Sequence, residues 1–199
     1  IFHQFSDLSD KEKVRIQDLD YVKNNYEFMG ELLLGHLRYG THGGNDKSNC
    51  HPRIRANNWK TRTLIVAGNF NMTNVDELFD KLVSLGQFPR EMSDTMTVLE
   101  KIGHFLDVEN QKLFKRYKPQ ISNNYEITPL IEHNINVAEI LKNAVEDFDG
   151  GYAMAGLIGH GDAFVIRDPN GIRPAYYYKD DEVVVVASER PAIQTSFNV

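Results

Sequence analysis

The feature that most constrains this chain is the stretch GHLRYGTHGG, which runs from Gly35 to Gly44. Three leucines, Leu32 to Leu34, lead directly into it. An apolar run that opens into a glycine-rich polar segment is typical of a buried strand that ends by delivering side chains into a pocket. We therefore expect a strand over residues 31–39, with the polar side chains of residues 38–42 at its end.

Arg38 is the residue of this stretch with the most specific chemistry. A guanidinium can hold a carboxylate with two parallel hydrogen bonds, and the neighbouring Thr41 and His42 could complete the shell around such a ligand. The alternative is that Arg38 pairs with an internal acid beside an ordinary turn. Ten residues do not separate the two interpretations, because short motifs often match by chance.

Composition narrows the class of protein. The net charge of −6 argues against a nucleic-acid-binding surface. A single cysteine, Cys50, excludes an internal disulfide framework and suits a reducing compartment such as the cytoplasm. No apolar run approaches the roughly 20 residues of a membrane helix. The chain starts at Ile1 in mid-pattern, without an initiator methionine, so we expect it to be part of a longer protein.

Strands are expected towards both ends of the chain, with helices grouped between them. The spacing Ser9-x-x-Glu12 predicts a capped helix to about Val22, with Val14, Ile16 and Leu19 facing inward. A long polar loop is expected over 40–61, and an exposed, irregular insertion over 110–128. The other expected elements are a buried strand at 63–67 that ends at Gly68, helices capped by Asn74 and Ser93, a helix over 135–145, a hairpin of 152–158 and 163–166, strands at 175–178 and 182–187, and a short terminal helix from about 188. This order favours an α+β fold of packed layers.

Three further segments, later in the chain, form a single pattern together with the first. They are GNFNMTN at 68–74, SDT at 93–95, and RDPNGIRP at 167–174 with VASE at 186–189. Together the segments resemble the glutaminase domain of the class-II glutamine amidotransferases, and among these the amidophosphoribosyltransferases. The resemblance implies an Ntn-hydrolase-type αββα four-layer sandwich. It would occupy residues 1–199 and be incomplete at its N-terminus, with a C-terminal phosphoribosyltransferase domain absent.

The resemblance also implies an activity and partners. Members of the family hydrolyse the side-chain amide of glutamine and pass the ammonia to a second domain. There, in purine synthesis, ammonia would replace pyrophosphate on phosphoribosyl pyrophosphate. The implied partners are glutamine and the protein's own phosphoribosyltransferase domain, in a homo-oligomer, with no nucleic acid and no membrane. No cofactor or metal is implied for the glutaminase domain, although Mg²⁺ could serve the absent domain.

The family's site residues carry over onto matching positions. Arg38 matches the clamp for the glutamine α-carboxylate, with Tyr39, Thr41 and His42 beside it. Asp94 matches the residue that pairs with the α-ammonium. The side-chain amide of Asn69 and the backbone N–H of Phe70 match the two donors of the oxyanion hole, which stabilise the tetrahedral intermediate.

Two departures from the family's pattern affect catalysis. The family's nucleophile is an N-terminal cysteine, and this chain begins with Ile1, so the chain as printed is not expected to hydrolyse glutamine. Phe70 stands where the family has glycine. Its N–H can still donate if φ stays negative, because only glycine adopts positive φ readily.

Several alternatives remain open from the residues alone. Asp94 could serve only to stabilise a helix N-terminus through its charge, and Asn69 could be a turn residue. Cys50 as nucleophile is disfavoured, because the adjacent His51 would point to the opposite face of an extended segment and no α-amine is near in sequence. Zinc held by His36, His42, Cys50 and His51 is disfavoured, because no standard ligand spacing matches. Another class-II enzyme such as an asparagine synthetase, or a non-catalytic glutamine-sensing domain, would explain the same motifs.

Overall fold

The computed structural model of the chain describes residues 8–37, 50–89 and 91–199. It divides into two compact units, residues 1–33 and 34–199, which are described separately. The four residues predicted to surround the glutamine carboxylate, Arg38, Tyr39, Thr41 and His42, lie outside the described residues. Their roles therefore stay predictions. Within the described part of the chain, no helix is long and apolar enough to cross a membrane.

The first unit contains two short helices, α1 (Asp10–Arg15) and α2 (Leu19–Asn25). The capping box is confirmed, since the Ser9 N–H donates to Glu12 over 2.9 Å. The single inward-facing helix to Val22 is wrong. The Asp18 carboxylate accepts the first free N–H groups of α2 and so starts a second helix. Val14 and Leu19 are 68% and 72% exposed, because two helices this short bury none of their residues.

The strand expected over 31–39 does not form in its described part, residues 31–37. A strand needs a neighbour to pair its backbone groups, and no strand in the described ladders pairs with this segment. The side chain of Leu37 is accordingly almost fully exposed. The prediction relied on the apolar run of three leucines, but an apolar segment forms a strand only where another strand pairs with it.

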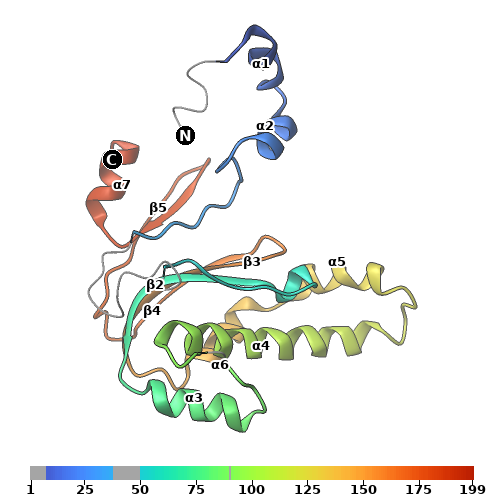
Figure 1. Cartoon of the computed structure of the whole chain (residues 1–199), viewed down its shortest axis with the longest axis vertical. Coiled ribbons are helices and arrows are strands. Elements are labelled where there is room, and N and C mark those ends of the chain that lie inside the picture. Colours follow the sequence, from blue (N-terminus) through green and yellow to red (C-terminus); the bar gives the residue numbers. More distant parts are fainter. Residues whose placement is uncertain (1–7, 38–49, 90) are drawn as a thin grey trace. The chain divides into compact units, whose positions relative to one another are not determined.

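The second unit is built on a four-stranded antiparallel sheet in the order β1-β2-β3-β4. Its strands are β1 (Arg53–Arg55), β2 (Leu64–Met72), β3 (Gly150–Ile158) and β4 (Ala163–Arg167). Helices α3 (Val75–Ser84), α4 (Asp94–Tyr117) and α6 (Val137–Val145) lie on one side of this sheet (Figure 1). The β3–β4 pair confirms the predicted hairpin.

The core lies between that face of the sheet and the helices. Every second residue of β2 and β3 points towards the helices, as the period of a strand requires. The buried members from the sheet include Leu64, Val66, Met72, Tyr152, Met154 and Ile158, and those from α4 include Val98, Leu99, Ile102 and Leu106. Burial of each such side chain stabilises the fold by about 1.5–3 kcal/mol.

A second sheet consists of β5 (Tyr176–Lys179) and β6 (Val184–Ala187), paired antiparallel. Helix α7 (Arg190–Phe197) packs on it, with the rings of Tyr178 and Phe197 5.5 Å apart. These strands and the terminal helix are where the sequence predicted them. In the described part of the chain, two antiparallel sheets, the first packed against several helices and the second against α7, make the fold α+β, as expected.

The exposed insertion predicted over 110–128 is wrong. Helix α4 continues to Tyr117, and α5 (Asn124–Asn134) follows after a short turn. Asn110 is fully buried, and its amide donates to the carbonyls of Thr61 and Leu106. Leu113, Ile127 and Ile131 form a second small core beneath Trp59. The apolar residues of this segment are few and stand among many lysines and arginines, so the sequence pattern did not reveal that the segment is helical.

The loop predicted over 40–61 is also partly wrong, because its described end contains β1 and the start of the short 3₁₀ helix η3 (Lys60–Arg62). β1 forms because its three residues pair with Leu64, Ile65 and Val66 of β2. A strand of three residues carries too little periodicity to be predicted from its own sequence.

Candidate active site

The site is organised by the second half of β2. The sequence predicts a strand that ends at Gly68, but β2 continues to Met72 because β3 pairs with it throughout, from Leu64↔Ile158 to Met72↔Gly150. Asn69 and Phe70 therefore lie in a strand and not in a turn. The strands approach closely here, since a Cβ on Gly68 would lie 2.6 Å from the carbonyl oxygen of Ala153. Only glycine fits at that position.

Asn69 and Phe70 present their side chains on opposite faces of β2. The Phe70 ring packs against the core on the helix side of the sheet. Asn69 is exposed on the other face. Among described residues other than glycine, φ is positive only at Phe28 and Asn198, so Phe70 meets the condition for backbone donation. Its role as an oxyanion donor stays a prediction.

Alternation along the ladder sets the direction of the Phe70 N–H. The N–H of Thr73 donates to Asp149, and the N–H of Gly159 donates to Thr63, so odd-numbered positions of the segment 63–73 bond towards β3. Residues opposite each other in an antiparallel pair alternate between bonded and non-bonded pairs. The N–H of Phe70 therefore points to the other edge of β2. β1 pairs with β2 only as far as Val66, so this edge is not covered by β1.

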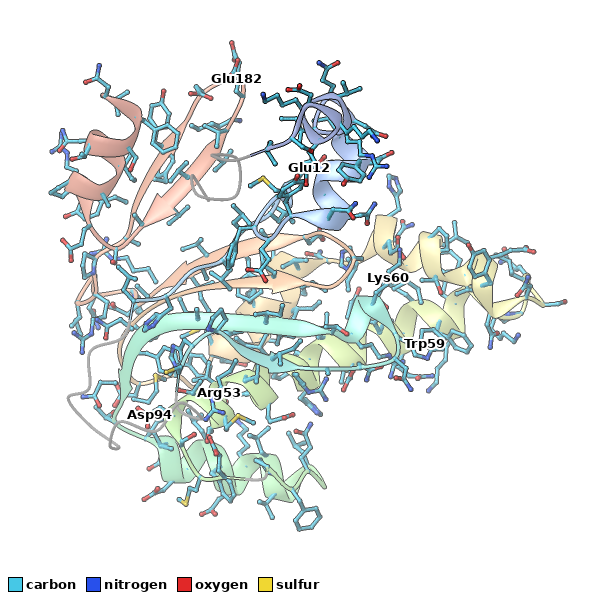
Figure 2. The ribbon with its side chains drawn as sticks, turned by 45° about the horizontal axis from the view of Figure 1, so that its top comes forward. Glu12, Arg53, Trp59, Lys60, Asp94 and Glu182 are labelled. Carbon is cyan, nitrogen blue, oxygen red and sulfur yellow. The ribbon has the colours of Figure 1, made fainter. Side chains whose placement is uncertain are left out.

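Asp94 lies at that edge. It is the first residue of α4, after the N-cap Ser93, whose hydroxyl accepts from the N–H of Met96. Its Oδ2 atom accepts a hydrogen bond from the N–H of Met72 over 3.3 Å. Figure 2 shows Asp94 at the start of α4, at the opposite end of the sheet from Trp59 and Lys60. The half-buried Asp94 carboxylate thus bonds the residue that follows Phe70 by two positions, on the edge of β2 towards which the Phe70 N–H points.

His51 is a residue of this edge that the sequence analysis did not assign to the glutamine site. Its Nδ1 atom is 3.3 Å from the backbone nitrogen and 3.1 Å from the carbonyl oxygen of Gly68. Its Nε2 atom is 3.0 Å from the hydroxyl of Thr95. The ring stacks on Phe70 with centroids 5.6 Å apart and contacts the ring of His36 at 4.7 Å. A lone histidine in a loop gave no signal that would have revealed these contacts.

The RDPNGIRP motif braces β3 opposite Phe70. The buried carboxylate of Asp168 accepts backbone N–H groups from Tyr152, Ile172 and Arg173 at 3.3, 2.8 and 3.0 Å. Burial by itself would raise the pKa of Asp168, but the three donors outweigh it, and the pKa lies below its ordinary value. Since Tyr152 pairs with Phe70, the motif supports the strand that lies opposite Phe70.

Of the residues named for the alternative chemistries, His42 lies outside the described residues. Cys50 is exposed. Within the described ranges, no group of three or more His, Cys, Asp or Glu side chains is arranged to hold a metal ion. An open hollow of about 410 Å³ lies between η3 and α5, and none of the predicted glutamine-binding residues lines it. Its lining residues are Asn58, Trp59, Lys60, Asn124, Tyr125 and Thr128.

Comparison with known proteins identifies the family of this chain. A family described as "Glutamine amidotransferase domain" matches residues 55–195. The amidophosphoribosyltransferase of Escherichia coli is 30% identical over 186 residues, which cover 90% of this chain and 33% of that protein. A glutamine–fructose-6-phosphate aminotransferase of Sulfurisphaera tokodaii is 23% identical and covers 88% of this chain and 23% of that protein.

A solved structure gives the same fold. The glutamine phosphoribosylpyrophosphate amidotransferase of Bacillus subtilis superposes with a TM-score of 0.54 at 24% identity, over 80% of this chain and 28% of that one. The chain thus spans only about a third or less of the length of the proteins that it matches. By sequence match and by fold, the chain belongs to the glutamine amidotransferase domain family.

Proposed function

We propose that the full-length protein is an amidophosphoribosyltransferase and that this chain is its glutaminase domain. Glutamine and water would give glutamate and ammonia, and the ammonia would displace pyrophosphate from phosphoribosyl pyrophosphate. The similarity to amidophosphoribosyltransferases of Escherichia coli and Methanocaldococcus jannaschii supports this acceptor. Because the chain spans about a third of the E. coli enzyme, the transfer step would belong to the rest of the protein.

One observation carries the glutaminase assignment: the edge of β2 beyond Val66, where β1 no longer pairs with it. There the Phe70 N–H points away from β3, and the Asp94 carboxylate lies beside Met72 at the same edge. Asn69, the adjacent residue, presents its amide from the face opposite the helical core. A negatively charged tetrahedral intermediate needs two such donors close together, and a substrate α-ammonium needs a carboxylate near them.

Glutamine would then lie with its amide at Asn69 and Phe70 and its ammonium at Asp94. Its α-carboxylate would be held by Arg38, with Tyr39, Thr41 and His42 alongside. Support for this end of the site comes from His36, which precedes Arg38 by two positions and whose ring contacts that of His51. None of the described residues is assigned here as the nucleophile. We expect the chain as printed to release no ammonia from glutamine, and a coupled ammonia assay tests this directly.

The deciding experiment uses the full-length protein with glutamine and one acceptor at a time. Phosphoribosyl pyrophosphate should give glutamate and pyrophosphate in equal amounts. Turnover with fructose 6-phosphate, or with aspartate and ATP, would instead identify a different class-II amidotransferase. Glutamine binding without glutamate formation under every condition would replace the enzyme with a glutamine-sensing domain.

Three further properties belong to this proposal. We expect the protein to act in the cytoplasm as a homo-oligomer, which fractionation and sedimentation would test. We also expect Mg²⁺ to serve only the phosphoribosyl transfer. Chelation with EDTA should therefore stop pyrophosphate release and leave glutamate formation intact. Loss of both steps on chelation would contradict a metal-free glutaminase site.

A further inference from the structure

We propose that His51 is a positioning residue that couples the two halves of the glutamine site, the oxyanion strand β2 and the start of α4. The inference rests on the proposed glutaminase function and adds a residue to it. His51 lies just before β1, and its ring reaches residues 17 and 44 positions away along the chain. No other side chain described here bonds both to the backbone of Gly68 and to Thr95.

Both ring nitrogens of His51 serve this connection. With the proton on Nε2, Nδ1 accepts the Gly68 N–H over 3.3 Å and Nε2 donates to the Thr95 hydroxyl over 3.0 Å. With the proton on Nδ1, the ring donates to the Gly68 carbonyl over 3.1 Å and accepts from Thr95. Either tautomer joins β2 to α4. The ring therefore acts through its neighbours, and we assign it no contact with glutamine.

The position of these bonds explains why they matter for the oxyanion hole. Past Val66, β1 no longer pairs with this edge of β2. Two side chains take its place, because His51 bonds Gly68 and Asp94 bonds Met72. The N–H of Phe70 lies midway between these two anchored positions. Its ring is also stacked on His51, with an angle of 21° between the planes. Displacement of His51 would remove one of the two hydrogen bonds that hold the strand on either side of the Phe70 N–H.

The same bond network fixes the ammonium end of the site. Thr95 follows Asp94 directly in the first turn of α4. A hydrogen bond from His51 to Thr95 therefore sets where that turn stands relative to β2. Loss of His51 should disturb both the binding of the ammonium, seen in KM, and the alignment of the oxyanion donor, seen in kcat.

The kinetic test compares two substitutions in the full-length protein. His51→Phe keeps the stacked ring but has no nitrogen, so kcat/KM should fall about fivefold to tenfold, as expected for lost hydrogen bonds. Both kcat and KM should change. His51→Gln can accept from Gly68 with its oxygen and donate to Thr95 with its amide, so it should recover most of the loss. If His51→Phe lowers only the melting temperature, with kcat and KM intact, His51 is structural and the proposal is wrong.

A double-mutant cycle tests the connection itself. Thr95→Val removes the hydroxyl at nearly constant volume, and Thr95→Ser keeps it. If His51 acts through Thr95, the double variant His51→Phe/Thr95→Val should lose less than the sum of the two single losses. Strictly additive losses would show that the residues act independently and would overturn the coupling.

Backbone hydrogen exchange provides a readout that needs no catalysis. His51→Phe should speed exchange of the Gly68 amide about fivefold and leave the Asn69 amide, which bonds towards β3, unchanged. If the wild-type protein shows no turnover but this exchange pattern appears, the proposed function fails while the connection made by His51 stands. Unchanged exchange at Gly68 rules out the tautomer that accepts the Gly68 N–H and leaves only the one that donates to the Gly68 carbonyl. If kcat and KM are also unchanged in His51→Phe, the proposal for His51 is overturned.

Discussion

The backbone N–H of Met72 donates a hydrogen bond to Oδ2 of Asp94 over 3.3 Å. This bond joins the last residue of β2 to the first residue of α4 and leaves the second carboxylate oxygen for another partner. Asp94 thus has two roles. Accepting the hydrogen bond from Met72 is structural and does not require a negative charge, whereas the proposed binding of the glutamine ammonium does require it. The two roles respond differently to substitution.

Asp94→Asn should separate these roles. The amide oxygen still accepts from Met72, but the charge that pairs with the glutamine ammonium is lost. We expect KM for glutamine to rise about ten- to a hundredfold, with little change in melting temperature. Asp94→Ala should show the same KM effect and also a lower melting temperature. Steady-state kinetics and thermal unfolding of both variants provide the measurement, and an unchanged KM in Asp94→Asn would remove Asp94 from the site.

Asn69→Ala should act mainly on kcat, because an oxyanion donor acts on the transition state. We expect kcat to fall about a hundred- to a thousandfold. Arg38→Ala should instead raise KM, since a carboxylate clamp binds substrate and transition state alike. Asn71→Ala is the matched control, because Asn71 is exposed on the same face of β2, two residues away. If Asn71→Ala is as damaging as Asn69→Ala, the role of Asn69 is not specific.

Gly103→Ala should destabilise the protein, although alanine is normally the better helix residue. The side chain of Arg55 crosses Gly103, and a new Cβ would lie 2.5 Å from its Cδ. Arg55 is held there by Glu100 and Asp107, at 2.9 and 2.7 Å. We expect a loss of about 1–3 kcal/mol in the free energy of unfolding.

The background Arg55→Ala is the control for this prediction. Once the guanidinium is removed, Gly103→Ala should stabilise the helix by about 0.5–1 kcal/mol, the ordinary difference between the two residues. Denaturant unfolding of the four proteins of the cycle measures both values. The same sign for Gly103→Ala in both backgrounds would show that Arg55 is not the cause.

Asp147→Asn should be more damaging than Lys101→Met. Lys101 is buried with its Nζ atom 2.7 Å from the Asp147 carboxylate, which Lys81 also contacts from a more exposed position. Burial lowers the pKa of Lys101, and Asp147 opposes this. Asp147→Asn leaves the buried ammonium without the negative charge that compensates it and should cost about 2–3 kcal/mol, whereas Lys101→Met removes the buried charge and should cost less than about 1 kcal/mol. Equal losses in chemical denaturation would contradict this asymmetry.

The same pair predicts a pH dependence. Hydrogen bonds from Lys101 and Lys81 lower the pKa of Asp147 to about 2. The ionised carboxylate therefore stabilises the folded protein fully above its unfolded pKa of about 3.9, and this contribution is lost as pH falls towards the folded value. The difference in unfolding free energy between wild type and Asp147→Asn should be constant above about pH 5 and shrink as pH falls towards 2. A difference in unfolding free energy that grows on acidification would contradict a lowered pKa for Asp147.

The sequence alone determined the features that depend on local pattern. The apolar run before Gly68 predicted β2, the turn residues at 159–162 predicted the β3–β4 hairpin, and Ser93 before Asp94 predicted the start of α4. These signals are local because capping, turn chemistry and strand period involve residues close together in the chain. The four motifs could place the chain in its family from sequence alone, because each motif is a short local pattern and the four follow one another in the family's order.

The tertiary structure alone decided how far β2 extends and which way its groups point. β2 continues to Met72 because β3, a strand far along the chain, supplies the pairing partners. That pairing turns the Phe70 N–H away from β3, towards the edge where β1 pairs only as far as Val66. His51 gave no signal, because its partners Gly68 and Thr95 lie 17 and 44 positions away. Contacts between residues so far apart in the chain are set by packing, which no local pattern encodes.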